Sequence, residues 1–422
     1  MSRLKTKLKK FWRGIGPGLA TGASDDDPSG IATYSIAGAK FGYMSLWTML
    51  YLLPFMIAVQ DMAARIGITS SCGLAGNIKR YYSKGLLVFV AILILSSNIF
   101  NIGADVAGMA AAIELLTPGS TKIISLIVVV FILFLVVKLS YRKIASIFKW
   151  LSLSLLVYVL AGFIAVDDWS RILVKTIIPS FEFTKDYIIM IVAIAGTTIS
   201  PYLAFWQASE EAEEKKMENG NRVKICKFRI VARSELRHTR RETAMGMFFS
   251  NFIGFFIIAL TGSVLFSAGV NGIETIEEAA TALQPLAGQY AYLLFTLGIV
   301  SAGLLAIPIL AGSAAYVLAE MFGWEASLDK PFNKAKEFYV VIIASTALGL
   351  LIPYLGISPI KALFYTAIIH GIVAPFLIGI VIHMANNPKI VGPNHAGHTH
   401  NLLSYLTMII LAVGTTIFFI TL

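Results

Sequence analysis

Charged residues are scarce in this chain: they make up 14% of its 422 residues, whereas hydrophobic residues make up 57%. A soluble domain has roughly a quarter of its residues charged, so a surface this poor in charge would aggregate in water. The mean hydropathy is correspondingly high, at +0.77. No charge-rich stretch is long enough to form a soluble domain, and no nucleophile pairs with a base. We therefore expect an integral membrane protein and not an enzyme.

Cysteine is also rare, with only two residues, Cys72 and Cys226, in polar connecting segments. Disulfide frameworks are typical of oxidising compartments and of small domains with many cysteines. The sequence therefore implies no disulfide framework.

Long apolar runs are what the sequence does contain. A helix needs about 20 apolar residues to cross roughly 30 Å of hydrocarbon. The fold class that we predict is all-α, a single transmembrane domain over residues 1–422. Its eleven membrane-spanning helices are expected at 12–41, 44–66, 87–116, 121–138, 144–166, 187–209, 243–269, 290–321, 336–355, 360–384 and 402–422.

The placement of Lys and Arg predicts the orientation. Of the 34 basic residues, 28 fall at the N-terminus or in even-numbered connections between the predicted spans, and six fall in odd-numbered connections. Basic residues are retained on the cytoplasmic side of a membrane. We therefore expect a multi-pass plasma-membrane protein with a cytoplasmic N-terminus and an extracellular C-terminus. The net charge of +10 mainly reflects this topology, so no nucleic-acid partner is expected.

Two predicted spans are interrupted at corresponding places, five spans apart. The span 12–41 contains GASDDDPSG at 22–30, and the span 187–209 contains AGTTISP at 195–201. Proline removes a backbone donor, and unwound backbone at membrane depth is tolerated where it lines a cavity. Broken first and sixth helices are typical of secondary transporters with a LeuT-like 5+5 inverted repeat. We expect repeats over about 12–166 and 187–384, and an extra helix over about 402–422.

Ionisable residues inside the predicted spans are candidates for function, because their burial in a membrane is costly. Asp25, Asp26 and Asp27 lie at the first break, Asp105 in the third span and His370 in the tenth. Three adjacent carboxylates repel one another, so at least one should point away from a shared site. We expect Asp27, beside the proline, to meet the sixth span. For Asp105, a structural role and a role in the ion path both remain open, and His370 is expected to pack or to form hydrogen bonds.

Both breaks offer oxygen atoms only. Carboxylates, hydroxyls and freed carbonyls are the ligands of hard cations such as Mg²⁺, with Ca²⁺ and Mn²⁺ next. No Cys or Met falls within 25–30 or 195–202, so a preference for thiophilic metals has no visible basis.

Several motifs resemble those of the NRAMP divalent-metal transporters. Asp27-Pro28-Ser29-Gly30 resembles the family's first-helix break, which reads Asp-Pro-Gly-Asn. Residues 196–201 are similar to its sixth-helix break, 105–108 to its third-helix Glu-Val-Ile-Gly, and 64–67 to the end of its second helix. Further matches to the first helix fall at 16–18, 32–33, 37–43 and 46–47. The resemblance implies a divalent-metal transporter.

The departures from the family pattern point to a different metal. In the family's manganese and iron transporters, the first helix supplies an Asp and an Asn, and the sixth supplies a carbonyl and a Met sulfur. The resemblance places Asp27 at the Asp, Gly30 at the Asn, Thr197 at the carbonyl donor and Ser200 at the Met. Loss of the sulfur removes discrimination against alkaline-earth ions. This pattern is similar to the bacterial NRAMP-related magnesium transporters, and it implies a metal site of Asp27, Ser29, Gly30, Thr197 and Ser200. The expected transported substrate is Mg²⁺, or also Mn²⁺, and no cofactor is expected.

The resemblance also bears on proton coupling. The two histidines that follow the family's sixth-helix break correspond to Tyr202 and Gln207, and its third-helix aspartate corresponds to Ile102. We therefore expect import without strong proton coupling. The residues that could line the ion path are Asp105, Asn98, Asn101, Gln207 and Asn251.

Two other functions remain open. One is a proton-coupled Mn²⁺/Fe²⁺ importer that tolerates Ser200. The other is a Na⁺-coupled carrier of a small organic solute, since one architecture serves several substrates. The loop histidines His395, His398 and His400 are expected to titrate in solvent and not to hold a metal.

Overall fold

The computed structural model describes residues 21–22, 24–139, 153–218, 226, 228–270 and 272–421, and its regular elements are all helical. Nine helical stretches in this part of the chain are long and apolar enough to cross a membrane, or ten if the bent pair around residues 166–168 is one span. This confirms an all-α, multi-pass membrane protein. Eleven spans were expected. The difference arises because two expected spans form one run of 43 residues, Pro28–Ser70.

The helices follow the expected spans closely. The long ones are α3 (Pro28–Phe41), α4 (Leu46–Ser70), α6 (Lys84–Glu114), α7 (Thr121–Lys138), α9 (Leu156–Ala165), α11 (Lys185–Thr198), α12 (Pro201–Glu218), α13 (Arg233–Thr261), α16 (Ala291–Phe322), α17 (Lys336–Gly349), α18 (Pro359–Ala385) and α20 (His398–Thr421). The short ones are α5 (Leu74–Tyr81), α10 (Trp169–Ile177), α14 (Ile276–Thr281), α15 (Gln284–Ala287) and α19 (Pro388–Val391). The starts of the expected spans 12–41 and 144–166 lie outside the described residues.

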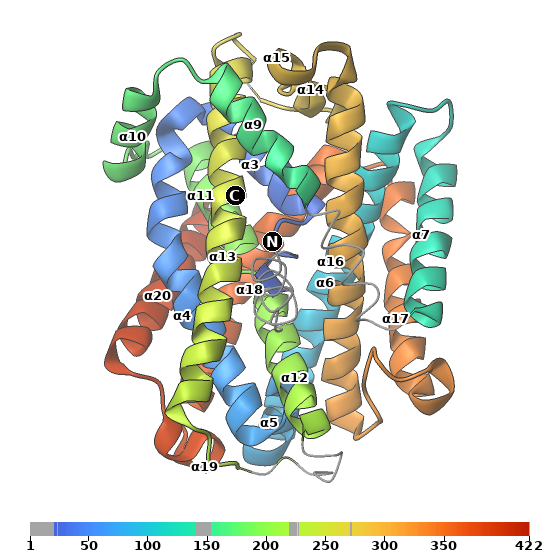
Figure 1. Cartoon of the computed structure of the whole chain (residues 1–422), viewed down its shortest axis with the longest axis vertical. Coiled ribbons are helices and arrows are strands. Elements are labelled where there is room, and N and C mark those ends of the chain that lie inside the picture. Colours follow the sequence, from blue (N-terminus) through green and yellow to red (C-terminus); the bar gives the residue numbers. More distant parts are fainter. Residues whose placement is uncertain are drawn as a thin grey trace, which may run out of the picture.

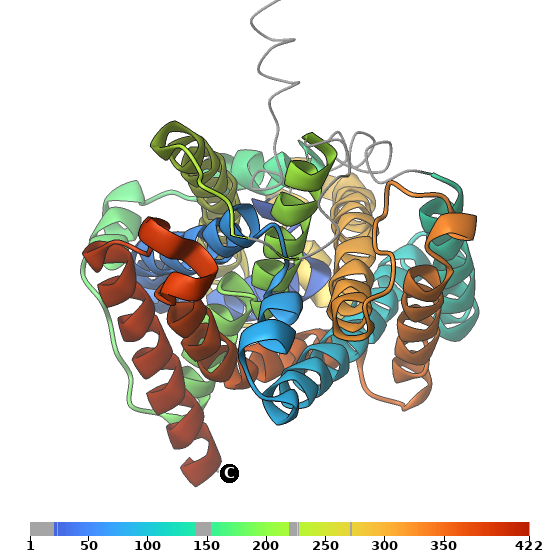
Figure 2. The ribbon, with the colours of Figure 1, turned by 90° about the horizontal axis from the view of Figure 1, so that it is seen from below.

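The helices form a centre and two flanks. α20 lies on one flank, and α7 and α17 lie on the opposite one (Figures 1 and 2). The most apolar part of α11 and α12 is 83% buried inside the protein, against 33% for α7, 33% for α17 and 22% for α20. Apolar side chains that the protein leaves uncovered are suited to contact with lipid. The interrupted helix α11–α12 is therefore shielded from the bilayer by the other helices.

Glycines allow the central helices to approach closely, as small residues commonly do in membrane proteins. A Cβ atom on Gly67 of α4 would lie 2.2 Å from the backbone oxygen of Ala208 in α12. A Cβ atom on Gly196 of α11 would lie 2.2 Å from the backbone oxygen of Ala367 in α18. Backbone oxygens cannot rotate away, so both crossings require glycine.

One expectation about the cysteines is wrong. Cys72, between α4 and α5, forms a disulfide with Cys226, which lies 154 residues later and ahead of α13. The two segments meet because the chain before α13 folds against the end of α4, where the Arg229 amide donates to the Thr69 carbonyl at 2.8 Å. Spacing in the sequence gave no sign of this contact.

The α4–α12 crossing gives a stability prediction. Gly67→Ala should destabilise the protein by about 1–3 kcal/mol, because the added methyl group meets rigid backbone. The control is Gly85→Ala in α6, where the nearest atom to a Cβ is the Ser83 hydroxyl oxygen at 4.0 Å. Thermal unfolding in detergent should show a lower midpoint for Gly67→Ala only. Equal midpoints for the two variants would contradict the close crossing.

Candidate metal-binding site

Both predicted helix breaks are present, and each is followed by a helix that begins with proline. α11 ends at Thr198, with Ile199 in a non-helical conformation (φ −110°, ψ 54°), and α12 begins at Pro201. α3 begins at Pro28, and Asp27 caps it in an extended conformation. Proline suits the first position of a helix because its missing N–H has no partner there. The prolines therefore end one helical segment and start the next.

Asp27 is the most completely hydrogen-bonded carboxylate at the breaks. Its Oδ1 accepts from the Gly30 amide and from the Ser29 hydroxyl, each at 2.7 Å. Its Oδ2 accepts from the Asn101 amide of α6 at 3.0 Å. With 2% of its surface exposed, the side chain is enclosed by the protein. Asp27 therefore caps α3 and also connects it to α6, the third predicted span.

The two breaks meet at Gly30 and Thr197. A Cβ atom on Gly30 would lie 3.2 Å from the Thr197 hydroxyl oxygen and 3.5 Å from Asp27 Oδ1. The Ser200 hydroxyl donates to the Thr197 carbonyl at 2.5 Å. The structure therefore brings together the five residues that were predicted for the metal site. The Ser200 hydroxyl is hydrogen-bonded to the Thr197 carbonyl, which was expected to face the ion.

Asp25 and Asp26 turn toward α13. The Ser250 hydroxyl lies 2.7 Å from Asp25 Oδ2 and 3.0 Å from Asp26 Oδ1. Since a hydroxyl has one proton, it can donate to one of the two at a time. The other oxygens, Asp25 Oδ1 and Asp26 Oδ2, are buried and have no hydrogen-bond partner among the described residues. Asp25 and Asp26 therefore each leave one carboxyl oxygen without a hydrogen bond in the described residues, close to Asp27 in the chain.

Asp105 lies at the same place. Its carboxylate interacts with the charge of Asp27 and faces the Ser29 amide. Neither of its oxygens has a hydrogen-bond partner within the described part of the chain. Asn101 and Asp105 are four residues apart on α6, so one face of that helix supplies both. These two predicted path residues belong to the site.

The other predicted path residues are engaged elsewhere. Asn98 donates to the Leu310 carbonyl of α16 at 2.9 Å, and Gln207 donates to the Thr243 hydroxyl of α13 at 2.8 Å. The amide of Asn251 contacts the Met56 sulfur at 2.6 Å. The amide nitrogens of these three side chains connect neighbouring helices.

Three residues that line the breaks, Ser250, Tyr202 and Tyr34, were not among those predicted for the site, although Tyr202 was noted as the counterpart of a family histidine. Asn251 was expected near the ion, but its neighbour Ser250 is the residue that faces the aspartates. Adjacent residues on a helix point about 100° apart, so only one of the two can face them. The Tyr202 hydroxyl lies 3.5 Å from the Ser24 carbonyl. The Tyr34 hydroxyl lies 3.1 Å from the Thr198 hydroxyl. The only feature of the sequence that could have identified these three residues is a polar side chain on a helix face directed at the aspartates.

The histidines do not build a metal centre. His370 is buried against the Tyr202 ring, with ring centroids 5.5 Å apart, and neither of its nitrogens has a hydrogen bond in the described residues. The expectation that His400 lies in solvent is wrong: it is 8% exposed, and its Nε2 lies 3.4 Å from Asp61 Oδ2, which also pairs with Arg65 at 3.1 Å. Over the residues that the structure describes, no three His, Cys, Asp or Glu side chains are placed to hold a metal ion together. A metal at the breaks would need hydroxyl or backbone oxygens as well.

The electrostatics of the breaks favour a cation. Asp25, Asp26, Asp27 and Asp105 are each at most 2% exposed. The ion pairs found among the described residues all involve other acids. An unpaired carboxylate buried in this way costs several kcal/mol. A bound cation would offset that cost, and the donor set fits a hard one.

The chain is similar to known membrane transporters. The family model described as "Natural resistance-associated macrophage protein-like" (Nramp) matches residues 18–421. The chain is 23% identical over 389 residues to the divalent metal cation transporter MntH of Caldanaerobacter subterraneus subsp. tengcongensis, covering 92% of this chain and 87% of that protein.

Solved structures show the same fold. The manganese transporter of Eremococcus coleocola, in complex with an aromatic bis-isothiourea substituted compound, superposes with a TM-score of 0.73 at 18% identity, over 96% of this chain and 87% of that one. A mutant of the same transporter gives a TM-score of 0.71 at 17% identity, over 96% and 85%. Because the family model covers nearly the whole sequence, the chain belongs to the Nramp family of membrane transporters and is not an enzyme.

Proposed function

We propose that this protein imports divalent metal cations across a bacterial plasma membrane, with Mg²⁺ preferred and Mn²⁺ also carried. The observation that carries the proposal is the group of four buried carboxylates, without basic partners in the described residues, where two helix breaks meet. The names of the relatives, a divalent metal cation transporter and a manganese transporter, support the class of substrate.

The preference for a hard ion rests on the chemistry of the donors. Carboxylate, hydroxyl and carbonyl oxygens surround the breaks, and residues 24–30 and 197–201 contain no sulfur. Mg²⁺ sheds water reluctantly and is usually bound with several waters retained. The free oxygens of Asp105 and Asn101 are suited to accept hydrogen bonds from such waters. A site of this kind binds the ion through one or two carboxylates and its own hydration shell.

We further propose eleven crossings, with the N-terminus in the cytoplasm and the C-terminus outside. The run Pro28–Ser70 then counts as two spans, because α3 and α4 are separated by a 3₁₀ turn at Gly42–Ser45. The inverted repeats would run over about 12–166 and 187–384, and α20, which is 22% buried, would lie outside both.

A proton-coupled Mn²⁺/Fe²⁺ importer is the second candidate, and the names of the relatives favour it. Against it stand the residues that follow the second break. Gln207 has no titratable group, and Tyr202 carries a phenol, which ordinarily titrates far above the range of histidine. The family match leaves the organic-solute carrier without support.

Proton coupling separates the two candidates directly. Proteoliposomes that contain the protein and an internal pH dye should show little acidification during Mg²⁺ or Mn²⁺ uptake. Acidification that scales with metal uptake and disappears with a protonophore would favour the second candidate.

Asp27→Ala should abolish uptake of every divalent ion. The substitution removes the carboxylate placed at the ion, and it also removes the cap of α3, which costs about 0.5–2 kcal/mol. Asp186→Asn is the matched control, because Asp186 forms an exposed pair with Lys40 at the ends of α11 and α3 that are opposite the breaks. Uptake into proteoliposomes should be normal in the control. A folded Asp27→Ala variant with normal Mg²⁺ uptake would refute the site.

Ser200→Met combined with Gly30→Asn should shift the ratio of affinities toward Mn²⁺ and Cd²⁺ by about tenfold, or about 1.4 kcal/mol. Sulfur binds softer ions, and the asparagine takes the space of a retained water. Calorimetric titration with Mg²⁺, Mn²⁺ and Cd²⁺ measures the ratio. Gly30→Ala controls for crowding, since any side chain there meets the Thr197 hydroxyl at 3.2 Å. An unchanged ratio in the folded double variant would refute the explanation by ligand softness.

A further inference from the structure

The disulfide lies at the end of the molecule where α5, the end of α12 and α19 are found (Figure 1). Cys72 is 3% exposed, whereas Cys226 is half-buried. Their Cα atoms are 5.0 Å apart. Cys226 is therefore the more accessible of the two residues to an attacking thiol.

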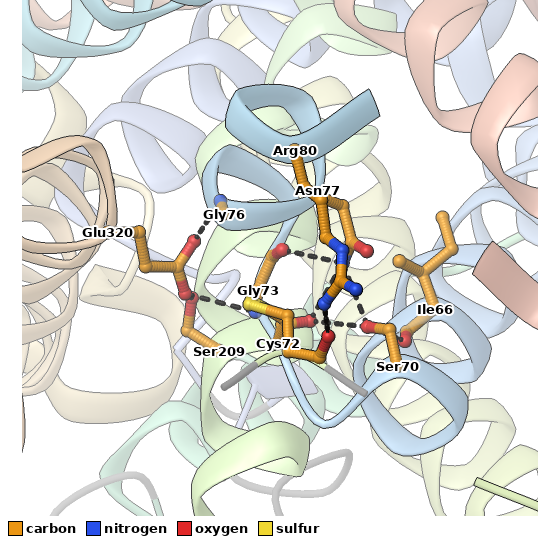
Figure 3. Close-up of a disulfide and its surroundings, with 10 residues drawn as sticks. Ile66, Ser70, Cys72, Gly73, Gly76, Asn77, Arg80, Ser209 and Glu320 are labelled. Carbon is orange, nitrogen blue, oxygen red and sulfur yellow. Dashed lines mark hydrogen bonds between the residues drawn. A yellow bond between two sulfur atoms is a disulfide. The ribbon is translucent and has the colours of Figure 1, made fainter. Parts of the chain in front are cut away.

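The Cys72 side of the bond is held by its own hydrogen bonds. Asn77 Nδ2 donates to the Ser70 hydroxyl at 2.8 Å, to the Cys72 carbonyl at 3.1 Å and to the Gly73 carbonyl at 2.9 Å (Figure 3). Ser70 in turn donates to the Ile66 carbonyl at 2.7 Å. None of these hydrogen bonds involves a sulfur atom of the disulfide.

The same turn is joined to two transmembrane helices. The Glu320 carboxylate of α16 accepts from the Gly73 amide at 3.0 Å and from the Gly76 amide at 2.7 Å, as Figure 3 shows. It also accepts from the Ser209 hydroxyl of α12 at 3.2 Å. The turn is therefore a fixed point beside the second half of the broken helix α11–α12.

The Cys226 side is attached more loosely. Arg80 donates to the Cys226 carbonyl, and the Arg229 amide donates to the Thr69 carbonyl at 2.8 Å. Val231 packs in a small apolar cluster with Ile68 and Leu236. The disulfide is the one covalent link between this segment, which leads into α13, and the turn after α4.

We propose that Cys72 and Cys226 form a reversible thiol–disulfide exchange site, whose disulfide restrains the opening of this end of the transporter. The inference is independent of which ion is carried. The Lys- and Arg-rich side is proposed to be cytosolic, where thiol pools keep accessible cysteines reduced. The bond would then form under oxidative conditions and slow transport.

The chemistry needs a dithiol reductant and a peroxide oxidant. A thiolate of the reductant attacks Cys226 Sγ, forms a mixed disulfide there and releases Cys72 as a thiolate, which takes up a proton. The second thiol of the reductant, as its thiolate, then attacks the reductant's own sulfur and frees Cys226, which is protonated in turn. In the reverse direction, the two thiols lose two electrons and two protons, and the peroxide O–O bond breaks to give two waters.

The restraint acts through the broken helix. α12 ends shortly before the segment that holds Cys226, and α13 begins after it. Transporters of this architecture move helix bundles against one another around a fixed site. A covalent link between Cys226, which lies ahead of α13, and the turn after α4 limits how far α13 and this turn can separate. Reduction leaves hydrogen bonds and a small apolar cluster, which can open during a transport cycle.

Mn²⁺ uptake into proteoliposomes, with and without dithiothreitol on both sides, tests the proposal. Reduction should raise the uptake rate of the wild type by about threefold, as expected when opening limits the cycle. The double variant with Cys72→Ser and Cys226→Ser should transport at the reduced rate under both conditions. Mass spectrometry after alkylation reports whether the bond is intact. Equal wild-type rates with the bond intact and cleaved, or two cysteines that form no disulfide on treatment with peroxide, would overturn the proposal.

Limited trypsin digestion gives a second measurement that does not depend on transport. Cleavage after Arg229 and Arg233 should be faster in the reduced protein and in the double serine variant than in the oxidised protein. Asp27→Ala should lose uptake and keep this redox-dependent cleavage, so failure of the metal site and failure of the exchange site can be told apart. Cleavage at the same rate in both redox states would refute the restraint.

Discussion

The carboxylate of Asp27 is the group on which the rest of the site depends. The first amides of a helix have no partners within it, and in a membrane no water is available to replace them. Asp27 satisfies the Gly30 amide of α3 and at the same time accepts from Asn101 of α6. One side chain therefore makes the helix break possible, fixes its distance from the third predicted span and supplies a negative charge. A substitution there changes the fold of the break and the charge of the site together.

Close packing places the other groups around this carboxylate. A Cβ atom on Gly38 of α3 would lie 2.0 Å from the Thr261 hydroxyl oxygen of α13, and one on Gly22 would lie 2.1 Å from the backbone of Gly246 in the same helix. The missing side chains let α13 approach the first break along its length. Ser250, one turn after Gly246, can then reach Asp25 and Asp26. The glycines and the aspartates are parts of one arrangement, although they lie far apart in the sequence.

The sequence predicted the parts of the site that depend on composition. Proline and small polar residues marked both breaks, and the absence of sulfur at 25–30 and 195–202 marked an oxygen-only site. The rotation of each helix was not predictable, because helices in a membrane protein are apolar on nearly all faces and give little periodic signal. Asn101 faces Asp27 while Asn98 faces Leu310, and only tertiary packing decides between them. The disulfide was not predictable either, because no local feature of the sequence brings residues 72 and 226 together.

The hydrogen bond from Ser200 to the Thr197 carbonyl has a consequence for turnover. A carbonyl oxygen has two lone pairs, so an ion at the proposed site would share this carbonyl with the Ser200 hydroxyl. The hydrogen bond draws electron density from the carbonyl, which weakens its hold on an ion, and it keeps the carbonyl satisfied when no ion is bound. A carrier has to release its cargo in every cycle, so a ligand shared in this way favours departure over tight retention.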